Sequence, residues 1–461
     1  MTTTMIHADQ LIRHAHIISM DQQRRIFLDG AIAIHDGRIA AIGPDRELSS
    51  SVEPSQELDV HGAVVHPGFV DAHAHTGLDL IRGLMGDNSA NWAAVENPFW
   101  ASMSRDDEYL GAQLACMEMV ANGTTLYCDT GSSFALDATV EAIQAVGMRG
   151  IPGHYIADQG DEIQGQTMPT AKCLERLEEQ VERYPFRSGA TVRCAVTLSG
   201  MTSVSDELLA GAKALAERRG VPMIMHQSWS EEEVAHAQAQ FGKRPVEHLG
   251  DVGVLGSNLT LIHMIHLDQR EVELVARSGT RVVHCPAASI RRAMGAIRVG
   301  RIPEMLEAGV VVGLGSDGHS GKHDLARQAY LAATLHREKR GVMPTIAAST
   351  AMEMITVNSA TALGMQNEVG SLEVGKYADI VIRGLDGPEC RPRFRNPVSN
   401  LVYYSLSRTV DTVLISGKVV FEHGNFTGFE VVDMYRRLDS RCAAIETQLK
   451  VDRGEDWPTI E

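Results

Sequence analysis

The feature that most constrains the fold is an alternation of strand-like apolar runs with helix-like segments, which starts near residue 64. The strand-like runs cover residues 63–75, 124–129, 149–155, 191–196, 221–226, 259–263, 281–285 and 310–317. Helix-like stretches such as Asp206–Arg219 and Gln269–Ser278 lie between them. This alternation is typical of parallel βα units. Eight units over about 300 residues predict a single (β/α)8 TIM barrel, an α/β fold.

Both ends of the chain show a different sequence pattern, which predicts short strands and turns in place of βα units. Before the barrel the strand-like runs are 11–18, 30–35 and 38–43, and after it they are 369–382 and 412–421. Asp36-Gly37 between two such runs predicts a hairpin. We therefore expect three parts: a composite β-sandwich from residues 1–63 and 368–430, the barrel at 64–367, and a C-terminal helix and tail at 431–461. Val431–Leu449 is the expected helix, available for docking or for contacts in a homo-oligomer.

Composition excludes several classes of protein. The formal net charge of −17 and the pI near 5.6 argue against nucleic-acid binding, which needs a concentrated basic surface. No apolar run reaches the roughly 18 residues of a membrane helix, and the amino terminus lacks a signal-peptide pattern. The seven cysteines are scattered without a C-x-x-C pair, as expected for reduced thiols. We expect a cytoplasmic enzyme with a small-molecule substrate and no membrane partner.

Polar side chains gather at the ends of the predicted barrel strands. His73 and His75 lie two residues apart at the end of the first strand, so their side chains project to the same side. His226, His263 and Asp317 end the fifth, sixth and eighth strands. In a barrel all five would meet at the carboxyl-terminal mouth.

Three imidazoles and one carboxylate form a complete ligand set for Zn²⁺, and would also accept Fe²⁺, Mn²⁺ or Co²⁺. Taken singly, His226 or His263 could be a hydrogen-bonded core histidine, and Asp317 a turn residue. Their joint occurrence at strand ends favours a metal centre.

Several motifs in order resemble the amidohydrolase superfamily, in the branch that includes triazine hydrolases and cytosine and guanine deaminases. The matching segments are 67–75, 80–83, 123–125, 263–267, 284–286, 313–318 and 370–379. The resemblance implies a barrel with a flanking β-sandwich, and metal ligands at His73, His75, His226 and Asp317. The fourth strand has no lysine that could bridge two metals, which favours one divalent ion, with zinc expected and iron, cobalt or manganese as alternatives.

The resemblance also implies a mechanism. A metal-bound water loses its proton to Asp317 as the general base, and the hydroxide attacks an electrophilic carbon. His263 polarises the substrate or stabilises the oxyanion, and Asp317 returns the proton to the departing group.

One departure from the family pattern bears on the substrate. Deaminases of this branch carry a glutamate three residues after the fifth-strand histidine, where it protonates a ring nitrogen, and here that position is Trp229. Glu231, Glu232 or Glu233 could replace it, although three acidic residues at a helix start are more simply a solvated first turn. We therefore expect hydrolysis of an amide, urea, carbamate or thiocarbamate bond in a small, fairly apolar molecule.

Two other functions stay open. The first is a deaminase or dechlorinase of a triazine-like or pyrimidine-like heterocycle, and the second is a non-catalytic scaffold of the same fold. Trp92, Trp229 and His319 are the expected substrate contacts, and their alternative is packing under loops or exposure to solvent.

Overall fold

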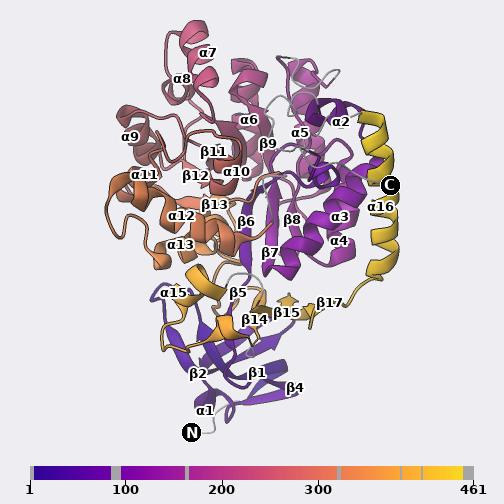
Figure 1. Cartoon of the computed structure of the whole chain (residues 1–461), viewed down its shortest axis with the longest axis vertical. Coiled ribbons are helices and arrows are strands. Elements are labelled where there is room, and N and C mark those ends of the chain that lie inside the picture. Colours follow the sequence, from indigo (N-terminus) through magenta and orange to yellow (C-terminus); the bar gives the residue numbers. More distant parts are fainter. Residues whose placement is uncertain are drawn as a thin grey trace, which may run out of the picture.

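The computed structural model describes residues 5–84, 95–160, 166–318, 323–384, 387–405 and 409–449 (Figure 1). Its centre consists of two parallel sheets. The first contains β6 (Phe69–Ala74), β7 (Thr124–Asp129) and β8 (Arg149–Ile151), in that order. The second contains β9 (Val196–Gly200), β10 (Met223–Gln227), β11 (Leu259–His263), β12 (Arg281–His284) and β13 (Val312–Leu314), also in chain order.

The edges of the two parallel sheets meet on both sides. On one side, the backbone N–H of Asp317, beyond the end of β13, donates to the carbonyl of His73 in β6 at 2.9 Å. Gly315 permits this approach, because a Cβ there would lie 2.7 Å from the Cβ of His73. On the other side, Gly150 of β8 forms a parallel bridge with Val192, which precedes β9. Residues at or next to the outer strands of the two sheets thus contact each other on both sides.

Several predicted strands differ from the structure. The run expected at 369–382 is a strand only at 380–383, and the run at 149–155 only at 149–151. Residues 63–75 form two strands, because β5 (Val64–Pro67) pairs with the terminal sheet and only β6 enters the parallel one. Gly68 makes the crossing, where a Cβ would lie 2.1 Å from the hydroxyl of Thr125. The strand expected at 191–196 was wrong in position, since β9 spans 196–200. The backbone of Arg193 bonds to Gly150 of β8, and pairing with β10 begins only at Val196.

Both ends of the chain build one nine-stranded sheet, in the order β17-β16-β15-β14-β5-β1-β2-β3 with β4 beside β1. Its other strands are β1 (Ile6–Ile18), β2 (Ile26–His35), β3 (Arg38–Pro44), β4 (Val52–Asp59), β14 (Ile380–Arg383), β15 (Val410–Ile415), β16 (Lys418–Glu422) and β17 (Asn425–Phe426). The Asp36-Gly37 hairpin is confirmed between β2 and β3, with positive φ at both turn residues. Buried Ile12, Ile32, Ile380 and Leu414 join the two termini in one apolar cluster.

Helices pack around the parallel strands, and the terminal sheet lies at one end of the molecule (Figure 1). The α-helices are α1 (Asp45–Leu48), α2 (Asn97–Ser102), α3 (Arg105–Ala121), α4 (Leu136–Val146), α5 (Thr170–Arg183), α6 (Asp206–Arg219), α7 (Glu231–Phe241), α8 (Pro245–Val252), α9 (Gln269–Ser278), α10 (Pro286–Arg291), α11 (Ile302–Glu307), α12 (Leu325–Arg340), α13 (Ala348–Met354), α14 (Val357–Ala362), α15 (Val398–Asn400) and α16 (Val431–Leu449). Short helical turns are η1 (Thr76–Ile81), η3 (Met201–Ser203), η4 (Pro388–Cys390) and η5 (Leu401–Ser405).

The expected C-terminal helix is confirmed as α16, with the predicted bounds. It buries Met434, Leu438 and Ile445 and contacts α3 and η1. The expected homo-oligomer stays a prediction. Within the described part of the chain, no helix combines the length and the apolarity needed to cross a membrane.

Candidate metal centre

The five polar residues predicted at strand ends come together at the carboxyl-terminal ends of the parallel strands. His73 belongs to β6, His226 to β10 and His263 to β11. His75 directly follows β6, and Asp317 lies three residues after β13 with a φ of 61°. All except His226 are less than one-tenth exposed.

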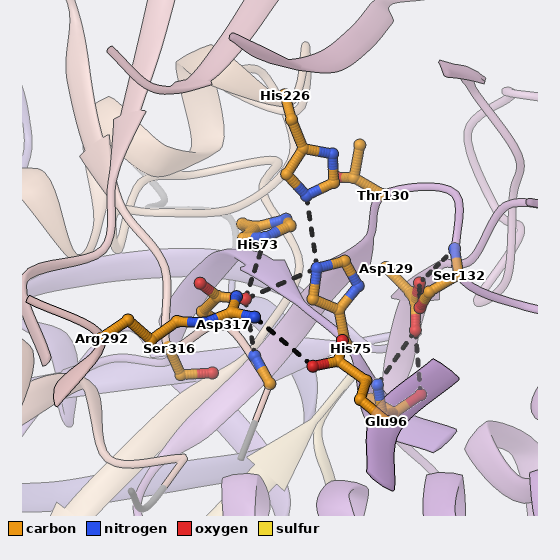
Figure 2. Close-up of polar contacts among 12 residues, drawn as sticks. His73, His75, Glu96, Asp129, Thr130, Ser132, His226, Arg292, Ser316 and Asp317 are labelled. Carbon is orange, nitrogen blue, oxygen red and sulfur yellow. Dashed lines mark hydrogen bonds and ion pairs between the residues drawn. The ribbon is translucent and has the colours of Figure 1, made fainter. Parts of the chain in front are cut away.

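Three distances within this cluster fit the edges of a tetrahedral metal site. His75 Nε2 lies 3.2 Å from His226 Nε2, and Asp317 Oδ1 lies 3.4 Å from His73 Nε2 and 3.5 Å from His75 Nε2 (Figure 2). A tetrahedral site with metal–ligand bonds of about 2.0–2.1 Å has ligand–ligand edges of roughly 3.3–3.4 Å. Ring nitrogens of His73, His226 and His263 also lie within 4.8 Å of one another.

Several polar atoms of the cluster are buried without a hydrogen bond among the described residues. They include both ring nitrogens of His73, Nδ1 of His75 and of His263, and Oδ2 of Asp317. Buried polar atoms in native proteins normally have a partner. The cluster thus offers nitrogen and oxygen atoms that make no hydrogen bond to the described residues, and such a set of donor atoms can hold a divalent metal ion.

The protonation states suit metal binding. Burial lowers the pKa of His226 to about 3 and holds the pKa of His75 and His263 well below the usual value, so these imidazoles are neutral near pH 7. Burial alone would raise the pKa of Asp317, but its contacts with His73 and His263 hold it well below its usual range. Neutral imidazoles and an ionised carboxylate are the forms that bind metals.

Neighbouring groups orient these side chains. The carbonyl of Ser199 contacts Nδ1 of His226 at 2.5 Å, which directs Nε2 of that ring toward the cluster. Asp71 Oδ1 accepts a hydrogen bond from the Ser316 N–H at 2.9 Å and thereby fixes the turn that carries Asp317. Asp71 lies close to His73 in the sequence, whereas Ser199 is 27 positions from His226 and no local pattern connects the two.

A cavity of about 140 Å³ opens above the cluster. Side chains other than the cluster that line it include Glu96, Trp100, Tyr155, Trp229, Arg292 and Met294. Trp229 therefore lines this cavity, and its expected contact with substrate stays a prediction. Trp92 and His319, also expected to contact substrate, lie outside the described residues.

His323 is not among the residues that line this cavity. Its Nδ1 lies 2.7 Å from Ser316 Oγ and its Nε2 lies 3.1 Å from Asp79 Oδ1. Burial would lower the pKa of His323, but the Asp79 carboxylate prevails and raises it to about 9. The side chain is thus held in a buried ion pair behind Asp317.

None of the three glutamates that open α7 lines the cavity. Glu231 and Glu232 are exposed, as a solvated helix start predicts, and Glu231 pairs with Arg298 at 2.7 Å. The same prediction is wrong for Glu233, whose buried carboxylate accepts hydrogen bonds from Gln227 Nε2 at 2.7 Å and Trp229 N at 2.8 Å. It is used to anchor the turn after β10.

The sequence interpretation missed one pair in the cavity wall. Arg292 Nη2 lies 3.4 Å from Glu96 Oε2, and the Glu96 side chain is 9% exposed (Figure 2). The two residues are 196 positions apart, so no local pattern could join them. The only signal was the position of Arg292 shortly after a strand end.

Comparisons with known proteins show which family the chain is similar to. A model of the amidohydrolase family matches residues 64–420. A 5-methylthioadenosine/S-adenosylhomocysteine deaminase of Syntrophobacter fumaroxidans is 34% identical over 436 residues, which cover 94% of this chain and 97% of the relative. A 5′-deoxyadenosine deaminase of Methanosarcina acetivorans is 30% identical, covering 90% of this chain and 93% of the relative. The solved structure of a zinc-bound adenosine deaminase from Xanthomonas campestris has a TM-score of 0.88 and 25% identity, covering 96% of this chain and 100% of the other.

Proposed function

This chain belongs to the amidohydrolase family and is a hydrolase of carbon–nitrogen bonds other than peptide bonds, and from that premise we propose that it cleaves amide, urea or carbamate bonds of small molecules. We further infer that the two parallel sheets close into one (β/α)8 barrel. The contacts of Asp317 with His73 and of Gly150 with Val192 support this inference.

Zinc is the proposed metal, held by His73, His75, His226 and Asp317. Their distances and the buried atoms without hydrogen bonds support this set. When bound, a divalent ion would acidify a water molecule and polarise the substrate carbonyl.

Two residues of the chain have distinct roles in the proposed reaction, one in proton transfer and one in stabilising charge. The Asp317 carboxylate, ionised at neutral pH, accepts the proton of the attacking water and passes it to the leaving nitrogen. His263, with an unbonded Nδ1 in the cluster, is placed to hold the substrate oxygen as charge develops on it. Water adds to the acyl carbon, the C–N bond breaks, and an acid and an amine leave.

The observation that carries this proposal is Trp229 in the cavity wall. A ring deamination needs a further acid to protonate the heterocycle, and an indole cannot donate a proton in that way. Glu233 does not line the cavity, since it is bound beneath the turn. An acyl carbon needs no ring protonation, because polarisation of its carbonyl suffices.

A panel of compounds tests this proposal on zinc-loaded protein. N,N-Dimethyl-N′-phenylurea, a phenylcarbamate and an anilide represent acyl substrates, and 5′-deoxyadenosine represents aminopurines. We expect release of aniline from at least one acyl compound and faster turnover than of the nucleoside, measured by chromatography of the products. Conversion of the nucleoside alone would contradict the proposal.

A second candidate is deamination of an adenine nucleoside, which the names of the similar relatives favour. Among the described residues that line the cavity, Glu96 is the carboxyl group outside the metal cluster. Within that described lining, Glu96 is therefore the residue that could act as the ring-protonating acid. Under it, Glu96→Gln would abolish ammonia release from 5′-deoxyadenosine.

A further inference from the structure

The Glu96–Arg292 pair lies in the wall of the reaction cavity, beside the metal cluster. Figure 2 shows Arg292 close to Asp317, with Glu96 reaching it from the side of His75. The contact from Arg292 Nη2 to Glu96 Oε2 is 3.4 Å, and the two side chains are 28% and 9% exposed. Both residues line the cavity. A group bound above the cluster would therefore meet one fixed cation and one fixed anion.

The pair brings no net charge to the cavity. The other carboxylate of the described lining, Asp317, contacts His73 and His75 of the metal cluster. Away from the metal, the electrostatic character of the cavity is thus set by Glu96 and Arg292.

An ion pair in the cavity wall, with no net charge, discriminates against substrates that carry a charge of their own. A substrate carboxylate would be attracted by Arg292 but repelled by Glu96. A substrate ammonium would be attracted by Glu96 but repelled by Arg292. A bound substrate would also displace water from the ion pair, so that a charge on the substrate would be poorly compensated. A neutral unit with an N–H beside a C=O suffers neither repulsion, since its N–H can donate to Glu96 and its C=O can accept from Arg292.

We propose that Glu96 and Arg292 form a charge filter that selects uncharged substrates with adjacent N–H and C=O groups, as in ureides, carbamates and amides. This inference rests on the proposed function and names the substrate class of the same site. The two residues determine specificity together, and neither takes part in the proton transfers assigned to Asp317.

The experiment measures the affinity of zinc-loaded protein for three matched probes by isothermal titration calorimetry. The probes are phenylurea, its anionic 4-carboxy derivative and its cationic 4-aminomethyl derivative. We expect the wild-type protein to bind phenylurea at least about tenfold more tightly than either charged probe. Glu96→Gln should shift the preference toward the anion, and Arg292→Met toward the cation, each by about tenfold or more.

The exposed ion pair Glu231–Arg298 provides matched controls with the same changes of side chain. Glu231→Gln and Arg298→Met should leave all three affinities unchanged. Arg292→Lys, which keeps the charge, should retain the preference for the neutral probe and so separates loss of charge from loss of packing. The results for Glu96→Gln and Arg292→Met test the proposal independently, so that one variant suffices if the other fails to fold.

Equal changes of all three affinities in Glu96→Gln and Arg292→Met would overturn the charge filter, and so would a wild-type protein that binds none of the probes. Failure of the proposed function has a different signature. In that case the probes would bind with the expected pattern, while no acyl compound of the substrate panel would be hydrolysed.

Discussion

At the residue scale, Asp317 has two proposed roles, as a metal ligand and as the carrier of the proton, and one substitution can test them. Its carboxylate contacts His73 and His75 and is the proposed carrier of the proton. Asparagine has nearly the same shape but cannot accept that proton. We expect Asp317→Asn to lower kcat by about 10³-fold, while circular dichroism shows a folded protein. Initial rates on the best compound of the panel measure the effect.

Asp251→Asn, in the exposed ion pair of α8 with Lys243, is the control for Asp317→Asn and should retain wild-type rates. Metal analysis of both variants separates loss of the ion from loss of the proton carrier. An Asp317→Asn protein with the wild-type kcat would contradict the assignment.

The five polar residues of the cluster were predictable because strand ends of a parallel barrel converge, whatever the loops between them do. The contacts in the cavity wall were not predictable from the sequence. Glu96 and Arg292 meet across 196 positions, and Glu233 looked like its exposed neighbour Glu231 although it folds back under Trp229. Such contacts depend on loop paths, which the periodicity of a sequence does not encode.

At the scale of elements, one buried carboxylate links two helices and predicts a pH dependence. Glu108 of α3 accepts hydrogen bonds from the N–H groups of Phe134 and Ala135, at the start of α4, and from the Thr139 hydroxyl. Burial, with a contribution from Asp129, raises its pKa to about 7. The folded chain then holds a proton that the unfolded chain loses above about pH 4.5, so this group costs stability as the pH rises from about 4.5 to 7.

Glu108→Gln cannot ionise and keeps an oxygen for the helix start. We expect the variant to be more stable than the wild-type protein at pH 8, by at most about 3 kcal/mol, and to lose this advantage at pH 5. Thermal melts at the two pH values measure the difference. Glu141→Gln on the exposed face of α4 is the control, and an unchanged pH profile in Glu108→Gln would contradict the expectation.

Strands and helices with strong local patterns were found at their predicted places, including β7, β11, α6, α9 and α16. The fourth predicted strand of the parallel set was displaced because its partner changes along its length. Val192 bridges to β8, whereas Val196 begins the pairing with β10. An apolar run shows that a segment is buried and extended, but it does not show where a ladder begins.

At the scale of the whole molecule, one buried ion pair fastens the parallel strands to the terminal sheet. Arg149 of β8 donates to Asp379, just before β14, at 2.8 Å, and the two side chains are 1% and 3% exposed. The guanidinium also lies 3.7 Å from the ring centroid of Tyr377. Asp379 further accepts the Ser416 N–H at 2.8 Å, so strands from both parts converge on one carboxylate.

Arg149→Met should therefore destabilise the protein far more than loss of a surface charge. The substitution keeps much of the volume but leaves the Asp379 carboxylate buried without its cation, a change that costs roughly 3–5 kcal/mol in comparable cases. We expect a clearly lower midpoint of thermal unfolding, together with earlier proteolysis at the joint between the sheets. Arg105→Met, which removes the exposed partner of Glu141, should leave the midpoint unchanged. Equal midpoints for the two variants would show that the sheets are held by their apolar contacts and that the ion pair serves only to set their register.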